Sequence, residues 1–273
     1  MVHDSFEKKC LDKGDHFKHI TSMTLVSGDA MDYSNEDRNF RLIINSINDE
    51  ESKCFTIHES VTITGLGKRR PTFKMEKPAA YVTFNSITDN PDWGDERGFV
   101  VIKDVTGLPN DGMTAASGGF AELATAVAGN IYMIKMFIHN NAADNYNLVA
   151  ENTRILVGMP TISGNSIMIQ GQIAADNCGS DASGAPGATD FFWDEAYLIS
   201  SNSFSVFFIS GSARYYNNVR DFSTSGFTLP NTLVSAAGAS VGYTTMDGKV
   251  RGCFQYSGYA TFLVTVKEST SNS

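Results

Sequence analysis

The residues best suited to chemistry form an acidic loop around a tryptophan. Hard cations such as Ca²⁺ prefer several oxygen ligands on a tight turn that contains glycine, and this loop has both. Its spacing differs from that of an EF-hand, and a solvated turn in which a carboxylate pairs with Arg97 explains the same residues. We therefore predict Ca²⁺ as a cofactor and expect no other. The predicted calcium ligands are Asp89, Asn90, Asp92, Asp95 and Glu96.

Aromatic residues are the second group with a recognisable chemistry. Some stand beside turns or in pairs, where they would form a sugar-stacking platform or a protein interface. Packing in the core is the alternative, because half of the residues on an alternating strand face inward. The candidates for an interface or ligand site are Trp93, Tyr215, Tyr216, Tyr256 and Tyr259.

No pattern typical of a hydrolase stands out. The chain has no G-x-S-x-G nucleophile elbow, although triads and carboxylate pairs from distant positions would leave no motif. Asp194 and Glu195 are the nearest candidates for a carboxylate pair, but a strand entry with its charges facing outward also explains them. His139 is expected to be a satisfied histidine at a strand end rather than an acid–base group. We therefore expect no enzyme and no catalytic residue.

Four cysteines are present, two in each half of the chain. An even number in a β-rich chain fits disulfides and an oxidising compartment. Four cysteines allow three pairings, and we expect disulfides within the halves, Cys10 with Cys54 and Cys178 with Cys253.

The composition restricts the fold classes that could position these candidate residues. Aromatic residues make up 11% of the 273 residues and charged residues only 19%. The abundance of β-branched and aromatic residues favours an all-β protein over a helical bundle or an α/β nucleotide-binding enzyme. The net charge of −9 argues against a nucleic-acid partner. No apolar run is long enough for a transmembrane segment.

Period-two alternation predicts many short strands. Gly129-Asn130 predicts a hairpin between residues 120–127 and 131–139, although the first of these segments also fits a short helix. Strands of this length and spacing predict an Ig-like antiparallel β-sandwich. The clearest predicted strands are residues 40–47, 54–64, 81–87, 99–103, 131–139, 153–157, 166–173, 196–199, 204–209 and 259–267.

Charge density divides the chain into two parts. We expect a charged, β-rich N-terminal segment or small domain over residues 1–65 and a linker over 66–78. The basic run Lys68-Arg69-Arg70 is predicted to be a solvated loop. The Ig-like β-sandwich would span residues 79–268, followed by a flexible tail over 269–273.

Several segments of the second part resemble bacterial cell-surface proteins. Residues 78–102 are similar to a motif of uncharacterised surface proteins, and residues 131–160 resemble the opening hairpin of their conserved repeat domain. Residues 192–195, 209–213 and 247–259 are similar to later parts of the same pattern, so the resemblance covers about residues 78–268. It implies Ig-like sandwiches in secreted or wall-associated proteins that act as spacers, stalks or adhesins, with no known catalytic residue. Residues 1–65 depart from the pattern, and the first 20 residues lack the apolar core of a secretion signal.

The predicted function is therefore a non-enzymatic, extracellular or cell-surface structural or adhesive protein. Self-assembly into a fibre or surface layer is one form of this prediction, because strand edges permit strand addition between chains. The alternative is a Ca-assisted glycan- or ligand-binding module, and a hydrolase is third. The expected partners are the chain itself, other surface proteins or glycans.

Overall fold

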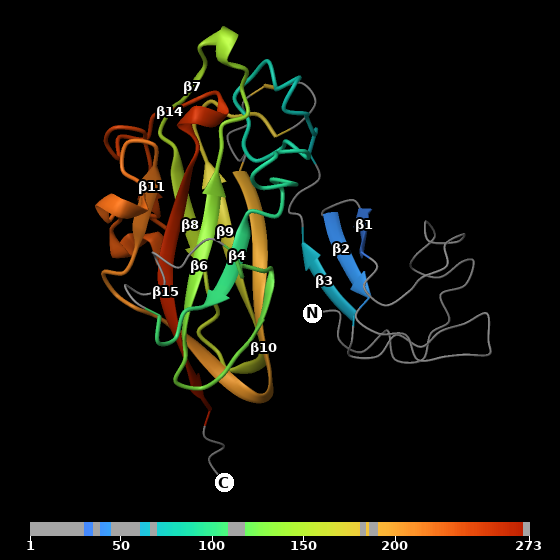
Figure 1. Cartoon of the computed structure of the whole chain (residues 1–273), viewed down its shortest axis with the longest axis vertical. Coiled ribbons are helices and arrows are strands. Elements are labelled where there is room, and N and C mark those ends of the chain that lie inside the picture. Colours follow the sequence, from blue (N-terminus) through green and yellow to red (C-terminus); the bar gives the residue numbers. More distant parts are fainter. Residues whose placement is uncertain are drawn as a thin grey trace, which may run out of the picture. The chain divides into compact units, whose positions relative to one another are not determined.

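The computed structural model of the chain describes residues 30–34, 39–44, 61–65, 70–108, 118–180, 184–185 and 191–269 (Figure 1). The chain divides into two compact units, Met1–Arg69 and Arg70–Ser273. This division falls within the predicted linker, but residues 70–78 belong to the second unit. Arg70 is buried there and donates from Nε to Ser86 Oγ at 3.1 Å. The prediction of a solvated basic loop is therefore wrong for Arg70, and residues 68 and 69 lie outside the described residues.

The first unit contains a small antiparallel sheet. Its strands are β1 (Ala30–Ser34), β2 (Asn39–Ile44) and β3 (Val61–Gly65), in the order β1-β2-β3. The predicted strands at 40–47 and 54–64 overlap β2 and β3, because alternation is a local signal that needs no tertiary information.

The second unit is built from strands and short 3₁₀ turns, with no α-helix in the described residues, so the all-β prediction is confirmed. The 3₁₀ turns are η2 (Asp144–Tyr146), η3 (Phe222–Thr224), η4 (Asn231–Val234) and η5 (Phe254–Tyr256). The strands are β4 (Val100–Asp104), β5 (Leu123–Thr125), β6 (Ile131–Ile138), β7 (Val149–Ala150), β8 (Arg154–Gly158), β9 (Gly164–Ala174), β10 (Phe191–Phe208), β11 (Arg214–Asn217), β12 (Phe227–Thr228), β13 (Ala239–Ser240), β14 (Val250–Arg251) and β15 (Gly258–Glu268).

The strands form two layers that share one long strand. β4, β6, β15 and β11 are hydrogen-bonded neighbours in one layer, and β8, β9 and the first half of β10 are neighbours in the other. After a register shift between Ile199 and Phe204, the second half of β10 pairs with β15. The strands predicted separately at 196–199 and 204–209 are thus parts of one strand of 18 residues that closes one side of the core.

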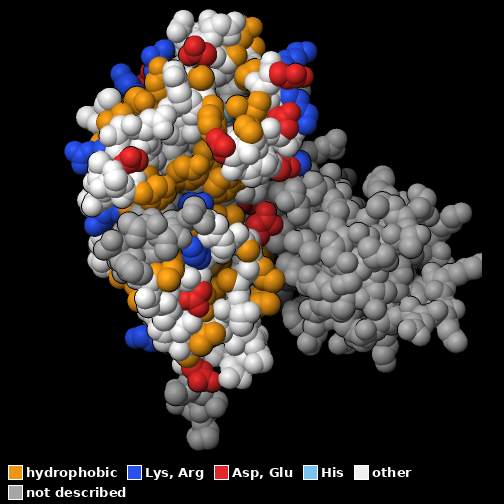
Figure 2. All heavy atoms as spheres, in the orientation of Figure 1, with side chains coloured by type: hydrophobic (Ala, Val, Ile, Leu, Met, Phe, Trp, Pro, Cys, Tyr) orange, Lys and Arg blue, Asp and Glu red, His pale blue; other side chains and the backbone are white. Residues whose placement is uncertain are grey.

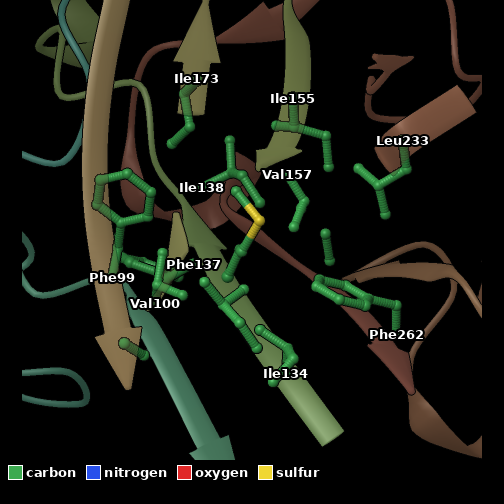
Figure 3. Packing of buried hydrophobic residues seen from close by; sticks show 14 of the residues in the cluster. Phe99, Val100, Ile134, Phe137, Ile138, Ile155, Val157, Ile173, Leu233 and Phe262 are labelled. Atoms are coloured by element: carbon green, nitrogen blue, oxygen red, sulfur yellow. The ribbon is translucent and has the colours of Figure 1, made fainter. Parts of the chain in front are cut away.

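The core lies between these layers, where inward-facing side chains from both sides meet (Figure 3). Val100 and Ile134 come from one layer, and Ile155 and Ile173 from the other, and all are at most 1% exposed. At Gly171 on β9 the two layers approach each other closely. A Cβ atom at this position would lie 2.7 Å from both Met136 Cε and Val100 Cγ2.

The predicted hairpin at Gly129-Asn130 is wrong in its pairing. The turn itself is present, since Asn130 N donates to Val127 O at 3.1 Å and Gly129 has a φ of 87°. However, β5 pairs in parallel with β10, with Leu123 opposite Tyr197, instead of folding back on β6. Local turn chemistry therefore positions the reversal, while tertiary contacts select the partner strand.

Candidate functional site

The candidate site is the side of the β4–β6–β15–β11 layer that faces away from the core. Paired residues on neighbouring strands share a face, so the register defines it. One cross-strand row is Val101, Lys135, Thr261 and Arg214. Trp93 and Phe120 are added to this surface by loops. We name it the Lys135 face. Its partly exposed members are Trp93, Val101, Lys103, Phe120, Lys135, Arg214 and Tyr259, and its buried members are Met133, Phe137, Tyr216 and Thr261.

Lys135 is the centre of this face. Its Nζ lies 4.0 Å from the ring centroid of Phe120, 5.0 Å from that of Trp93 and 5.4 Å from that of Tyr259. These distances are typical of cation–π contacts, in which the negative face of a ring attracts an ammonium group. The rings come from two loops and a neighbouring strand, so only the folded chain brings them together.

The surroundings of Lys135 disfavour its charge. Burial, together with the nearby ammonium of Lys103, lowers the pKa of Lys135 to about 8. Lys135 forms no ion pair with any residue that the structure describes. The ring contacts are therefore the main interactions that offset the cost of burying the Lys135 charge. They stabilise the charge less than an ion pair with a carboxylate would.

Trp93 is held firmly at one end of the face. Its ring stacks on Phe137 at a centroid distance of 4.9 Å, and its Nε1–H donates to Gly98 O at 3.0 Å. Its loop is closed by reciprocal backbone hydrogen bonds between Asn90 and Gly94, and Gly94 adopts a φ of 87° that glycine tolerates. The backbone N–H of Trp93 also donates to Asn90 Oδ1.

A buried polar network anchors the same loop from inside. Glu96 is 0% exposed, and its Oε1 accepts from Asn90 Nδ2 at 2.6 Å and lies 2.8 Å from Nδ1 of His139. Its Oε2 accepts from Asn141 Nδ2 at 2.7 Å. The backbone N–H of His139 in turn donates to Asn85 Oδ1. The expectation of a satisfied strand-end histidine agrees with these contacts.

Four of the five predicted calcium ligands contact different protein groups, and the fifth, Asp92, is exposed. Glu96 is directed inward, and Asp95 pairs with Arg97 at 2.6 Å, as in the plain-turn interpretation. Asn90 Oδ1 accepts from the backbone of Asp92 and Trp93, and Asp89 accepts from Met75 N. Among the described residues, no group of three or more His, Cys, Asp or Glu side chains is arranged to hold a metal. The geometry gives the calcium site no support, and calcium binding stays a prediction.

The five predicted interface aromatics separate into two groups. Trp93 and Tyr259 lie together on the Lys135 face at 5.8 Å, and Phe222 connects Tyr259 to Tyr216, on which it stacks at 4.5 Å. Burial, followed by the carboxylates of Asp92 and Glu96, raises the pKa of Tyr259, so its phenol stays protonated as a donor.

The remaining two predicted aromatics lie elsewhere. Tyr215 faces the core and is 0% exposed, because its neighbour Tyr216 takes the outward position on β11. Tyr215 is therefore inaccessible as an interface residue in the folded chain. Tyr256 packs against Tyr243 and Arg251, outside the Lys135 face.

The carboxylates of Asp194 and Glu195 are buried, which differs from the outward orientation expected of them. Asp194 is 0% exposed and Glu195 1%. Asp194 Oδ2 accepts the backbone N–H of Val100 at 2.7 Å and so occupies the edge of β4. Burial, aided by the neighbouring carboxylates Glu122 and Glu195, raises the pKa of Asp194 well above its usual range.

The predicted disulfide between Cys178 and Cys253 is not formed. Both residues are thiols, and the Sγ of Cys178 is buried and donates to Ala175 O at 3.2 Å. The prediction was wrong because an even cysteine count carries no distance information. Cys10 and Cys54 lie outside the described residues.

Sequence reasoning missed the residue that organises the site. Lys135 was visible as the one charged residue in an otherwise apolar strand, and that interruption was the available signal. Aromatic rings beside a cation suit a ligand that combines apolar surface with negative charge. Figure 2 shows hydrophobic side chains and Lys or Arg side chains reaching the surface together on one side of the second unit.

Comparison with known protein families, with curated proteins and with solved structures finds no match to this chain. The resemblance to bacterial cell-surface proteins thus stays a prediction. Within the described part of the chain, no helix is long and apolar enough to cross a membrane.

Proposed function

We propose that the chain is a non-enzymatic adhesive protein of an extracellular or cell-surface setting, and that it binds its partner through the Lys135 face. The observation that carries this proposal is the half-buried Lys135 ammonium among the rings of Trp93, Phe120 and Tyr259. Aromatic residues are enriched at the centres of binding surfaces because they bury a large area with few rotatable bonds.

The Ig-like class is part of this proposal. Two facing layers of mostly antiparallel strands support a sandwich, as does the resemblance over residues 78–268. The shared strand β10 and the parallel pair β5–β10 are the features in which the second unit departs from two separate antiparallel sheets.

We place adhesion before self-assembly because the described edges of the second unit are closed or short. The edge of β4 is occupied by Asp194 at Val100 and by Ala121 at Ile102. β11 is covered by the two-residue strand β12, and β8 is partly covered by β13. Strand addition requires a longer row of open backbone groups than these edges offer.

A glycan is the partner class that the rings favour. Trp93 and Tyr259 offer neighbouring aromatic surfaces, and the Tyr259 hydroxyl and Lys135 ammonium add polar groups next to them. This combination of apolar surface with a few placed polar groups is typical of small-ligand sites. The calcium-assisted version of this function rests on the sequence pattern alone.

A glycan array probed with the full chain, in EDTA and in Ca²⁺, tests the proposal. We expect binding in EDTA that is lost in Trp93→Ala and largely kept in Trp93→Phe, because stacking needs a ring. Tyr146→Ala is the matched control, since Tyr146 is an aromatic residue 52% exposed on a different loop. Failure of the wild type to bind any glycan or surface protein would contradict the adhesive function. Turnover of ester, peptide or glycoside substrates would contradict its non-enzymatic nature.

A further inference from the structure

We propose that the Lys135 face binds an acidic polysaccharide, with a sugar carboxylate placed on the Lys135 ammonium and the sugar rings over Trp93 and Tyr259. This inference rests on the proposed adhesive function and specifies its ligand class. The charge of Lys135, the cations around it and the spacing of those cations support the inference.

The charge of Lys135 is incompletely compensated within the described chain. Its Nζ has three rings around it and no described carboxylate, while the ammonium of Lys103 disfavours its charge. A carboxylate bound here would gain a charge-assisted hydrogen bond and would offset the repulsion from Lys103. A neutral sugar would bury the ammonium further without supplying a counter-charge, which costs free energy.

The same face carries further positive charge. Lys103 lies on β4 and Arg214 on β11, and both are on the outward side by register. Lys267 lies at the end of β15, with its Nζ 4.9 Å from the ring centroid of Phe207. The whole chain has a net charge of −9, and the carboxylates of Asp92 and Glu96 lie close enough to Tyr259 to raise its pKa, so the positive charge is local to Lys135, Lys103 and Arg214. This local charge is complementary to an anionic partner.

The spacing of the cations favours a polymer over a small anion. Lys135 and Arg214 are separated by one intervening strand, β15, which corresponds to about 10 Å across the sheet. The Arg214 guanidinium donates from Nη1 to Gly211 O, which fixes its position at the far side of the face. One small anion cannot reach both groups, whereas a polysaccharide with a charge on each sugar presents carboxylates to both.

The test compares two polymers with the same sugar backbone, one with free carboxylates and one in which methyl esters remove the negative charge. Polygalacturonate and its fully methyl-esterified form are immobilised, and the binding of the full chain is measured by biolayer interferometry in EDTA at pH 7. We expect the acidic polymer to bind at least about tenfold more tightly, the effect of one charge-assisted contact. Lys135→Gln should remove most of this preference, and Lys135→Arg should keep it. Lys249→Gln is the matched control, because Lys249 is an exposed lysine outside the Lys135 face.

The outcomes separate this inference from the proposed function. Equal binding of both polymers, unchanged in Lys135→Gln, overturns the acidic ligand but leaves glycan adhesion standing. Binding of poly-glutamate with no binding of either polysaccharide overturns the inference in favour of an acidic protein partner. Absence of binding to both polymers and to every partner on the array overturns the adhesive function itself.

Discussion

Among the described residues of the second unit, three carboxyl groups are buried, those of Glu96, Asp194 and Glu195, with exposed fractions of 0%, 0% and 1%. Each is held by a specific donor, as when Asp194 accepts the N–H of Val100 or Glu195 accepts the hydroxyl of Tyr197. Burying a carboxyl group costs free energy unless hydrogen bonds replace water, and Asp194 Oδ1 has no hydrogen-bond partner among the described residues. The hydrogen bonds that these three groups do form stabilise particular arrangements of loops and strand edges.

Glu96→Gln is expected to lower the free energy of unfolding by about 3 kcal/mol, the cost of breaking a buried pair. The amide would leave His139 and Asn141 without their shared negative acceptor. Urea denaturation followed by tryptophan fluorescence measures the change. Asp92→Asn, an exposed carboxylate in the same loop, should change stability by less than about 0.5 kcal/mol. Similar losses in both variants would show that the loop charge matters and the buried network does not.

The buried carboxyl group of Asp194 should make the stability of the protein depend on pH. Because burial raises its pKa, the native state keeps a proton that the unfolded carboxyl loses above about pH 4. Unfolding then releases a proton, so the free energy of unfolding should fall as pH rises above that value, by up to about 1.4 kcal/mol per pH unit. Asp194→Asn carries no proton to lose and should flatten this slope. Urea unfolding of both proteins at pH 4 to 8 provides the measurement, and parallel curves would refute the assignment.

At the scale of elements, alternation predicted most strands, including β4, β6, β8, β9 and β15. It predicted a strand at residues 81–87 that is absent, because Phe84 and Ile87 take part only in isolated bridges within an irregular segment. It also could not show that β5 pairs with β10, since pairing depends on residues more than 70 positions away.

The close approach of the two layers gives an element-scale prediction. Gly171→Ala should lower the free energy of unfolding by about 1–3 kcal/mol, because its Cβ would collide with Val100 and Met136 in a packed core. Gly158→Ala is the control on the adjacent strand β8, where the nearest atom to the new Cβ is 3.9 Å away. Thermal and urea unfolding of both variants would reveal the difference. Equal stability of the two would mean that the layers are farther apart than described.

At the scale of the whole molecule, the chain consists of two compact units, and the core cluster of the second unit is drawn from residues 82–266. A fragment of residues 70–273 should therefore fold alone, with a near-UV circular dichroism spectrum of the second unit and one cooperative urea transition. A fragment of residues 99–273 should fail to do so, because it lacks Val82, Phe84, Ile87 and Glu96, all of which are buried. Cooperative folding of the shorter fragment would contradict the described core.

The sequence by itself determined the all-β class, the positions of most strands and the turn at Gly129-Asn130, because alternation and turn chemistry are properties of neighbouring residues. It also placed Trp93, Tyr216 and Tyr259 among the candidates for binding. The tertiary structure decided which side chains meet. It turned Glu96 inward, left Cys178 and Cys253 as thiols and surrounded Lys135 with rings from two loops and a strand. These outcomes depend on contacts between distant segments, which a local pattern does not encode.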